Sequence, residues 1–257
     1  MLPTAQAIAP RANLAMRTPP AGILFRPVPA LGVSLGLTTA TTRELANGLA
    51  RAPQSPEPNA TVLSFDRDDE IVAQDDDATH CYLIVSGCVR TVRLMEDGRR
   101  QIGDFLFAGD VFGWEALDKH DFGAEAVTPV TIRRYTHRDL DRLADQDAGV
   151  ARRLCALLRG RIRSGREHVV RLGRMAASER IASFLVQMTT TLPNHNATIE
   201  LPMSRVDIGD YLGLTIETVC RQLTRLRQHG TIEIDGAKIV IRNQRVLLAS
   251  GCDHVVH

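Results

Sequence analysis

The chain has 257 residues, enough for two domains of ordinary size, and its 44% hydrophobic and 24% charged residues are typical of a globular protein. No apolar run approaches the ~18–20 residues that a membrane helix needs, which argues against a membrane protein and favours a cytoplasmic one. The net charge of +1 is the sum of segments of opposite charge: Asp66–Glu70 and Asp75–Asp77 are acidic, whereas Arg152–Arg174 is rich in arginine.

Cysteine and histidine usage argues against a metalloprotein. The five cysteines are odd in number, spread along the chain and without a C-x-x-C pair: Cys81, Cys88, Cys155, Cys220 and Cys252. This disfavours a disulfide scaffold or a zinc knuckle and suits a reducing cytosol. His80, His120 and His137 lack metal-ligand spacing, so we expect no metal site. A cupin-type metalloenzyme, which needs clustered His and Glu ligands, is a disfavoured alternative.

The N-terminal 58 residues are expected to form an arm. Residues 1–43 contain six prolines and four arginines, and no acidic residue precedes Glu44. A short helix is predicted around Thr41–Ala52, and the prolines that follow it mark a boundary.

Residues 59–148 are predicted to form a β domain. Short β-branched runs alternate with turn signals, and six of them are expected strands: Thr61–Phe65, Ile71–Ala73, Cys81–Ser86, Val89–Met95, Gln101–Phe107 and Val130–Tyr135. The turn signals include Asp97-Gly98 and Gly123. Many short strands with close turns favour a β-sandwich or small barrel, followed by a short helix at His137–Asp145.

A long helix is predicted over residues 149–175. The stretch has no proline, and apolar residues recur at spacings of three or four with arginines on the other faces. A helix of about 25 residues would span nearly 40 Å, longer than a small barrel needs for cover. We therefore expect it to pair with a second chain, although a helix lying on its own domain is the alternative. The expected dimerisation residues are Val150, Leu154, Leu157, Leu158, Ile162 and Val169.

Residues 176–257 hold the predicted DNA-reading element. A helix at Glu179–Thr190 is followed by a short helix that a serine begins, Met203–Leu212. Gly213, Leu214 and Thr215 form a tight turn, in which Gly213 supplies the positive φ, and Thr215 begins a second helix, Ile216–His229. The apolar contacts between the two helices are expected from Ile208, Leu212, Leu214, Val219 and Leu223. This order is typical of a helix-turn-helix, whose second helix enters the major groove. Alternating apolar residues around an Asp-Gly turn then predict a hairpin, the wing.

The second helix carries the candidate base-reading residues. Glu217, Cys220 and Arg221 share one helical face by their spacing. Arg221 can hold guanine O6 and N7 through two hydrogen bonds, while Glu217 can accept from cytosine N4 or orient the arginine. Further expected DNA contacts, mostly to phosphates, are Ser204, Arg205, Thr215, Thr218, Thr224, Arg225 and Lys238.

Two runs of sequence resemble CRP/FNR regulators. SRVDIGDYLGLTIETVCRQLTRLRQHGTI is similar to their DNA-binding motif, and YLIVSGCVRTVRLMEDGRRQIGDFLFAGDVFGWEAL is similar to their sensory β-roll. The resemblance covers roughly residues 60–245. It implies an α+β protein with an N-terminal β-roll (a jelly roll of the cyclic-nucleotide-binding type), a long dimerisation helix and a C-terminal winged helix-turn-helix. It also implies a transcription regulator rather than an enzyme, which recruits RNA polymerase.

The motif Glu217-Thr218-Val219-Cys220-Arg221 resembles the Glu-x-x-Ser-Arg of the FNR branch, whereas the CRP branch carries arginine where Ile216 stands. The resemblance implies a TTGAT-N4-ATCAA palindrome whose outer base pairs Glu217 and Arg221 read. Cys220 replaces the usual serine, and a thiol is a poorer hydrogen-bond donor than a hydroxyl. Oxidation of Cys220, which would add negative charge beside phosphates, is a further prediction; a passive small residue is the alternative.

No cofactor is expected in the β-roll. Cyclic-AMP binders of the family carry an arginine in the phosphate cassette, but this chain has Gly123-Ala124-Glu125-Ala126, where Glu125 would repel a phosphate. Residues 1–80 contain no cysteine for an iron–sulfur cluster. The resemblance therefore favours the FixK-like branch, activators of microaerobic, nitrogen-fixation or denitrification genes. A haem-dependent NO or CO sensor of the same superfamily, or a cyclic-nucleotide-binding regulatory subunit, is the alternative.

Overall fold

The computed structural model of the chain describes residues 60–116, 118–193 and 197–252. The predicted N-terminal arm and its helix at Thr41–Ala52 lie outside these residues. No helix of the described part is long and apolar enough to cross a membrane.

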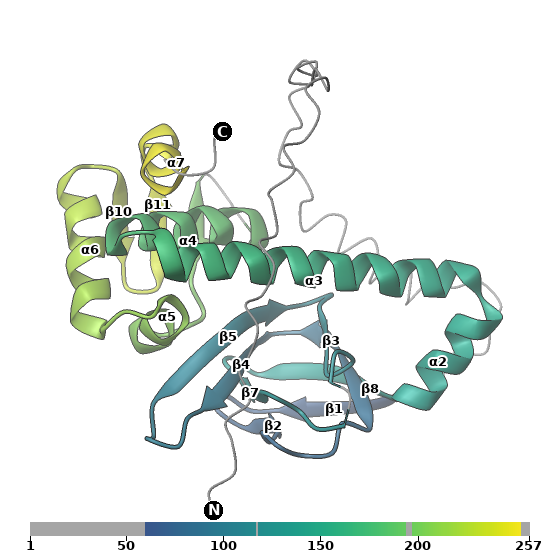
Figure 1. The fold of residues 1–257 in the computed structure, drawn as a ribbon. Helices are drawn as coiled ribbons and strands as arrows, with labels where there is room; N and C mark the ends of the chain where they lie inside the picture. Colours follow the sequence, from purple (N-terminus) through teal and green to yellow (C-terminus); the bar gives the residue numbers. More distant parts are fainter. Residues whose placement is uncertain (1–59, 117, 194–196, 253–257) are drawn as a thin grey trace, which may run out of the picture. The chain divides into compact units, whose positions relative to one another are not determined.

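The first half of the described chain is a β-roll of two four-stranded sheets (Figure 1). One sheet has the order β1-β8-β3-β6 and the other β2-β7-β4-β5. The strands are β1 (Thr61–Phe65), β2 (Glu70–Val72), β3 (His80–Ser86), β4 (Cys88–Leu94), β5 (Arg100–Phe107), β6 (Val111–Phe112), β7 (Gly123–Ala126) and β8 (Val130–Thr136). The predicted sandwich is confirmed, and an apolar core fills it, with Val89, Ile84 and Ile132 at 0–1% exposure.

Strand β7 corrects the sequence prediction, which placed a turn at Gly123. Gly123–Ala126 pairs with β2 and with β4 in antiparallel register. Glycine and alanine are poor strand formers, so the composition predicted no strand. The glycine suits a close approach of the neighbouring strand, because a Cβ on Gly123 would lie 3.2 Å from the carbonyl oxygen of Val72. The two-residue strand β6 was missed as well.

Two helices follow the roll. Helix α2 (His137–Gln146) ends at Asp147, whose side chain accepts a hydrogen bond from the N–H of Gly149 and begins α3 (Ala148–Arg174). Helix α3 is anchored to the roll by Arg161, whose Nη1 lies 3.0 Å from Oδ2 of Asp104 and whose Nη2 donates to the carbonyl of Val111.

Part of the dimerisation prediction is wrong for the first turns of α3, because two of the predicted contact residues are buried within the same chain. Val150 and Leu154 are 5% and 2% exposed and pack against Cys81 and Leu140 of the same chain. They are therefore not available to a partner helix. The spacing of three and four placed them on one stripe with the later apolar residues, but it could not show that the roll covers the start of that stripe.

The last third of the described chain holds four helices and a small sheet. Its elements are α4 (Ala177–Thr191), β9 (Thr198–Glu200), α5 (Arg205–Leu212), α6 (Ile216–Gln228), β10 (Ile232–Asp235), β11 (Lys238–Ile241) and α7 (Gln244–Cys252). The predicted hairpin is confirmed as β10 and β11, and β9 extends it to three strands. Strand β9 and helix α7 were not predicted.

One apolar core joins the roll to this C-terminal region. Residues of β4 and β5 belong to the same buried cluster as residues of α4, α5 and α6. At its centre the ring of Phe105 lies 5.3 Å from that of Tyr211 and 6.5 Å from that of Phe184. Tyr211 and Phe184 are 2% and 1% exposed, so β5 and the first helix of the reading element share a common core.

His168 of α3 is stacked on Tyr211, and its burial leads us to expect that the stability of the protein depends on pH. The ring of His168 lies 4.4 Å from that of Tyr211, and its Nε2 is buried without a hydrogen-bond partner. Burial, and then the charge of Arg171, lowers the pKa of His168 to about 4. Between pH 6.5 and 4 the unfolded chain therefore takes up a proton that the folded chain does not, and stability falls as the pH falls.

We expect this histidine to cost about 2 kcal/mol of stability between pH 7 and pH 5, at about 1.4 kcal/mol per pH unit below its unfolded pKa. His168→Phe keeps a ring on Tyr211 but does not titrate. Between pH 7 and pH 5 its free energy of unfolding should therefore fall by about 2 kcal/mol less than that of the wild type. Urea unfolding of both proteins at the two pH values, at one protein concentration, measures the difference. An equal loss in both proteins would show that His168 is not the titrating group.

Candidate nucleic-acid interface

Helices α5 and α6 and the turn between them form a helix-turn-helix. The Ser204 hydroxyl accepts from the N–H of Asp207 and begins α5; the Thr215 hydroxyl accepts from the N–H of Thr218 and begins α6. Gly213 ends α5 with a left-handed backbone, at φ 62° and ψ 44°. All three features were predicted, because short hydroxyl side chains satisfy the free N–H groups of a helix start and glycine adopts positive φ at little cost.

The inner face of α6 fixes its position. Val219 and Leu223 are 0% and 4% exposed and join Ile208 and Leu212 of α5 in the buried core. The predicted apolar contacts between the two helices are thus confirmed. Because this face is fully occupied, the opposite face of α6 is directed outward.

That outward face carries the predicted base-reading residues. The residues that are exposed on it are Glu217, Cys220, Arg221 and Arg225, with Thr224 half-buried beside them. The structure therefore brings the five together on one helix surface. Cys220 is a free, exposed thiol on this surface.

A chain of hydroxyl groups orders the start of this surface. The Thr215 hydroxyl lies 3.2 Å from that of Thr218, which also accepts from Nη2 of Arg221 at 3.2 Å. The pKa of Glu217 lies below its ordinary value, because its own backbone N–H and then the Thr215 hydroxyl donate to the carboxylate. The lowered pKa favours the ionised carboxylate of Glu217, which only accepts hydrogen bonds and so suits the amino group of cytosine N4.

Two of the remaining predicted contacts, Ser204 and Arg205, have other partners in the free chain. The Ser204 hydroxyl donates to Oδ2 of Asp207 at 2.8 Å as part of the capping box of α5. Half-buried Arg205 donates to the carbonyl of Gly236 at 3.3 Å and so connects α5 to the turn of the wing. Lys238 is exposed at the start of β11, on the wing.

Ile216 is a surface residue for which the sequence motif predicted no role. It is the first residue of α6 and 41% exposed, next to Glu217. An exposed apolar side chain at the tip of a recognition helix can contact a thymine methyl group in the major groove. The sequence could have indicated this contact, because an isoleucine stands at the first position of α6, outside the apolar face that packs against α5.

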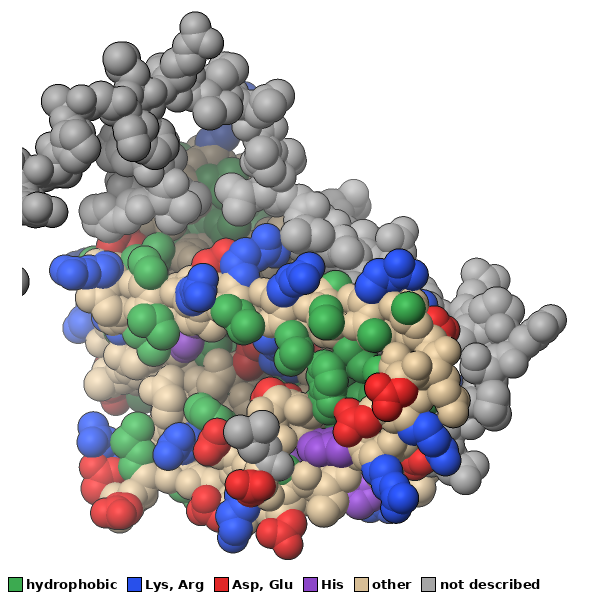
Figure 2. All heavy atoms as spheres, turned by 45° about the vertical axis from the view of Figure 1, so that its right-hand side comes forward, with side chains coloured by type: hydrophobic (Ala, Val, Ile, Leu, Met, Phe, Trp, Pro, Cys, Tyr) green, Lys and Arg blue, Asp and Glu red, His purple; other side chains and the backbone are tan. Residues whose placement is uncertain are grey.

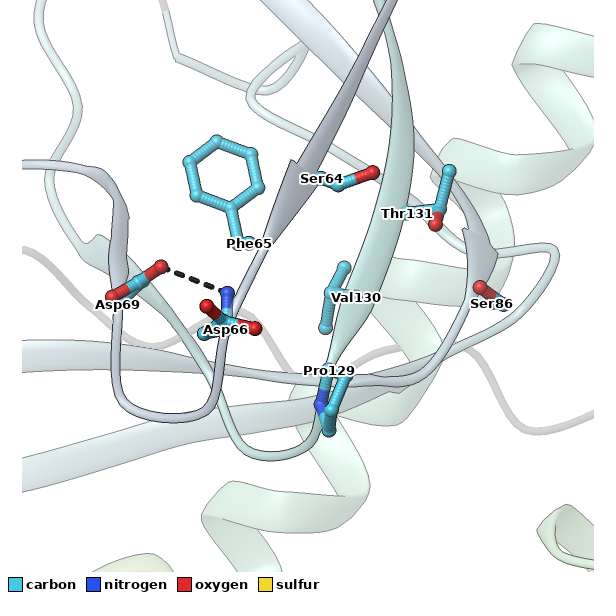
Figure 3. A pocket seen from close by; sticks show the side chains of 8 residues that line it. All are labelled: Ser64, Phe65, Asp66, Asp69, Ser86, Pro129, Val130 and Thr131. Atoms are coloured by element: carbon cyan, nitrogen blue, oxygen red, sulfur yellow. Dashed lines mark hydrogen bonds between the residues drawn. The ribbon is translucent and has the colours of Figure 1, made fainter.

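A hollow of about 390 Å³ lies in the β-roll where β1 and β3 end and β8 begins (Figure 3). Its two charged lining residues are Asp66 and Asp69, and Oδ2 of Asp69 accepts from the N–H of Asp66 at 2.8 Å. Carboxylates here repel an anion such as a cyclic phosphate. Elsewhere in the roll, Glu125 forms an ion pair of 2.7 Å with Arg90, so that this arginine is already occupied.

Comparison with known proteins agrees with this geometry. The model of the cyclic nucleotide-binding domain matches residues 62–147, and that of the Crp-like helix-turn-helix domain matches residues 179–250. The nitrogen fixation regulation protein FixK of Azorhizobium caulinodans is 39% identical over 232 residues, 86% of this chain and 93% of that protein. FixK of Rhizobium meliloti is 38% identical over 192 residues, 75% of this chain and 87% of its own length.

Among solved structures, FixK2 from Bradyrhizobium japonicum is 43% identical and superposes with a TM-score of 0.70, covering 73% of this chain and 95% of that one. The relatives span the roll, the long helix and the reading element together. The chain thus belongs to the CRP/FNR family of DNA-binding transcription regulators, in its FixK branch.

Proposed function

We propose that the chain reads a TTGAT-N4-ATCAA-type palindrome as a homodimer, without cyclic AMP, an iron–sulfur cluster or another bound ligand. It activates nitrogen-fixation, microaerobic or denitrification genes with RNA polymerase in the cytoplasm. The observation that supports this most directly is the outward face of α6, where Glu217 and Arg221 are exposed together and Arg221 donates to the Thr218 hydroxyl. The relatives named for nitrogen fixation regulation support the choice of genes.

The chemistry of this face suits direct base reading. Arg221 presents two parallel donors to guanine O6 and N7, and Glu217 accepts from cytosine N4. Ile216 meets a thymine methyl group at the tip of the helix. Thr224, Arg225 and Lys238 are left for phosphate oxygens, together with the hydroxyls of Thr215 and Thr218 once DNA displaces their mutual contacts.

The second half of α3 supplies the dimer contact. Leu158, Ile162 and Val169 recur at spacings of four and seven, with Ile162 and Val169 57% and 70% exposed. Figure 2 shows hydrophobic side chains in a row beside arginines along this helix. Exposed apolar residues with a seven-residue repeat pack against the same stripe of a second helix. Leu157 is half-buried at the edge of the stripe.

Changing one of two neighbouring valines tests this dimer. Val169→Glu places a charge on the stripe, and Val170→Glu places the same charge one residue away, where the 45% exposed side chain lies off the repeat. We expect Val169→Glu to raise the dimer dissociation constant at least about a hundredfold and Val170→Glu to change it by less than about threefold, since a charge buried unpaired costs several kcal/mol. Analytical ultracentrifugation measures both. Equal dissociation of the two variants would contradict the stripe.

Cys220 oxidation stays a prediction of regulation at the same surface. A sulfenic or sulfinic acid there would bring negative charge or bulk to a helix face that meets DNA. A Cys220→Ser protein is expected to keep its DNA affinity in peroxide longer than the wild type.

The palindrome itself is tested by fluorescence anisotropy with purified, dialysed protein under reducing conditions at fixed salt. We expect binding to a TTGAT-N4-ATCAA duplex at least about a thousandfold tighter than to a scrambled duplex. Equal affinities would contradict ligand-free reading of this site.

A further inference from the structure

A group of ion pairs connects two strands of the β-roll to the first helix of the reading element. Arg90 of β4 reaches Oδ1 of Asp207 at 3.4 Å. Arg100 of β5 reaches the same Oδ1 at 2.8 Å and Oδ2 of Asp210 at 2.7 Å. We call these four residues the roll–helix ion pairs. Each pair joins residues more than a hundred positions apart in the chain.

The charges at the centre of these ion pairs are buried. The side chains of Arg90 and Asp207 are 11% and 5% exposed. A buried charge is tolerated only when it is paired and hydrogen-bonded, and removal of one partner leaves the other uncompensated. The two residues therefore favour the arrangement of the roll and α5 in which they meet.

Arg90 is held in place from the roll side. Its Nε lies 2.7 Å from Oε2 of Glu125 on β7, and its Nη2 lies 3.1 Å from Oδ1 of Asp68. Asp68, in the turn before β2, has a left-handed backbone at φ 67°. The two carboxylates of the roll, Asp68 and Glu125, hold the guanidinium of Arg90 in a direction from which it also reaches Asp207 of α5.

Asp207 is held from the helix side. Its Oδ2 accepts from the backbone N–H and from the hydroxyl of Ser204, which makes it the reciprocal member of the capping box of α5. One carboxylate thus begins the helix that supports α6 and receives the two arginines of the roll. The contact with the roll and the start of α5 therefore share one side chain, Asp207.

The apolar contact between β5 and α5 stabilises their association but does not by itself fix the orientation of α5. Phe105, Tyr211 and Phe184 lie together in the shared core. Burial of apolar surface depends on area and tolerates small rotations, whereas charged hydrogen bonds of 2.7–3.4 Å require one geometry.

We propose that Arg90 and Arg100 are positioning residues, which hold α5 and hence the recognition helix in one orientation through Asp207 and Asp210. The inference rests on the proposed ligand-free DNA binding: side chains of this chain provide the fixed arrangement that a bound effector would otherwise have to select. A two-state protein whose binding-competent arrangement is only partly populated binds in proportion to that population.

Two adjacent arginines allow a matched test. Arg100→Met removes the guanidinium that reaches α5 but keeps an apolar stem, and Arg99→Met makes the same change in a side chain that is 76% exposed and pairs with Asp97 of its own hairpin. Both variants have the same net charge, so long-range attraction to DNA is equal. We expect Arg100→Met to bind the palindrome at least about tenfold more weakly, and Arg99→Met within about twofold of the wild type.

Amide hydrogen exchange of the free proteins supplies a readout of the contact itself. In Arg100→Met the amides of α5 and β5 should exchange faster, while those of α4 and the core strands β3 and β8 stay protected, which excludes general unfolding. Asp210→Asn, which keeps both arginines and the helix cap, should weaken binding in the same direction by a smaller factor. If Arg100→Met does not fold, Asp210→Asn alone tests whether the contact between the roll and α5 affects DNA binding.

Unchanged affinity and unchanged exchange in both Arg100→Met and Asp210→Asn would overturn the proposal. A wild-type chain that fails to select the palindrome would instead overturn the proposed function, because the positioning effect is measured as a ratio to the wild type. In that event faster exchange of α5 in Arg100→Met alone would still support the contact.

Discussion

Arg221→Ala is expected to remove the discrimination of the palindrome at guanine. Arg221 is exposed on α6, and a bidentate arginine–guanine contact is worth about 1–3 kcal/mol of discrimination. A homodimer makes that contact in both half-sites, so about 2–6 kcal/mol, or at least about thirtyfold in affinity, should be lost. The measurement is anisotropy with the TTGAT-N4-ATCAA duplex and with a duplex in which the guanine of each half-site is replaced.

Arg227→Ala is the matched control, since Arg227 is exposed on the same helix but lies six residues farther, on another face. It removes the same charge and should leave discrimination unchanged. If Arg221→Ala still prefers guanine as strongly as the wild type, Arg221 is not the residue that reads that base.

Gly209→Ala is expected to disrupt the helix-turn-helix. A Cβ at this position in α5 would lie 2.6 Å from the carbonyl oxygen of Leu214, and the N–H of Leu214 also donates to the carbonyl of Gly209 at 2.9 Å. A backbone atom cannot rotate away as a side chain does, so α5 and the turn before α6 must separate. We expect a loss of about 1–3 kcal/mol in the free energy of unfolding and loss of selective DNA binding.

Gly160→Ala makes the same change in α3, where a new Cβ would meet nothing within 4 Å. Alanine is the better helix former by about 1 kcal/mol, so this variant should be as stable as the wild type or more stable. Urea unfolding of both variants measures the contrast. If Gly209→Ala were as stable as Gly160→Ala and bound DNA normally, the close approach of α5 and the turn would be contradicted.

Local patterns in the sequence predicted the reading element well. Ser204, Gly213 and Thr215 were identified as helix-end residues because each performs its role within three or four residues of itself. The outward face of α6 followed from helical spacing alone, because Val219 and Leu223 could serve only as the buried face.

Features that depend on distant residues were not predictable in this way. The carboxylates of α5 that pair with Arg90 and Arg100 lie more than a hundred residues away in the chain, so no spacing rule indicated them. Strand β7 was missed because glycine and alanine are poor strand formers, and the close approach of β2 that suits Gly123 is not visible in the sequence. Val150 and Leu154 were assigned to the dimer contact because periodicity defines a face of a helix, not what covers it.

The spacing of the half-sites tests the central claim most directly. Two recognition helices in a symmetric dimer should lie about one DNA turn apart, ~34 Å. Lengthening the N4 spacer by about half a helical turn, five base pairs, moves the second half-site to the opposite face of the duplex. Ligand-free protein should therefore bind the TTGAT-N4-ATCAA duplex selectively and the lengthened duplex no better than a scrambled one. Equal, selective binding to both duplexes would contradict a dimer that reads two half-sites with fixed recognition helices.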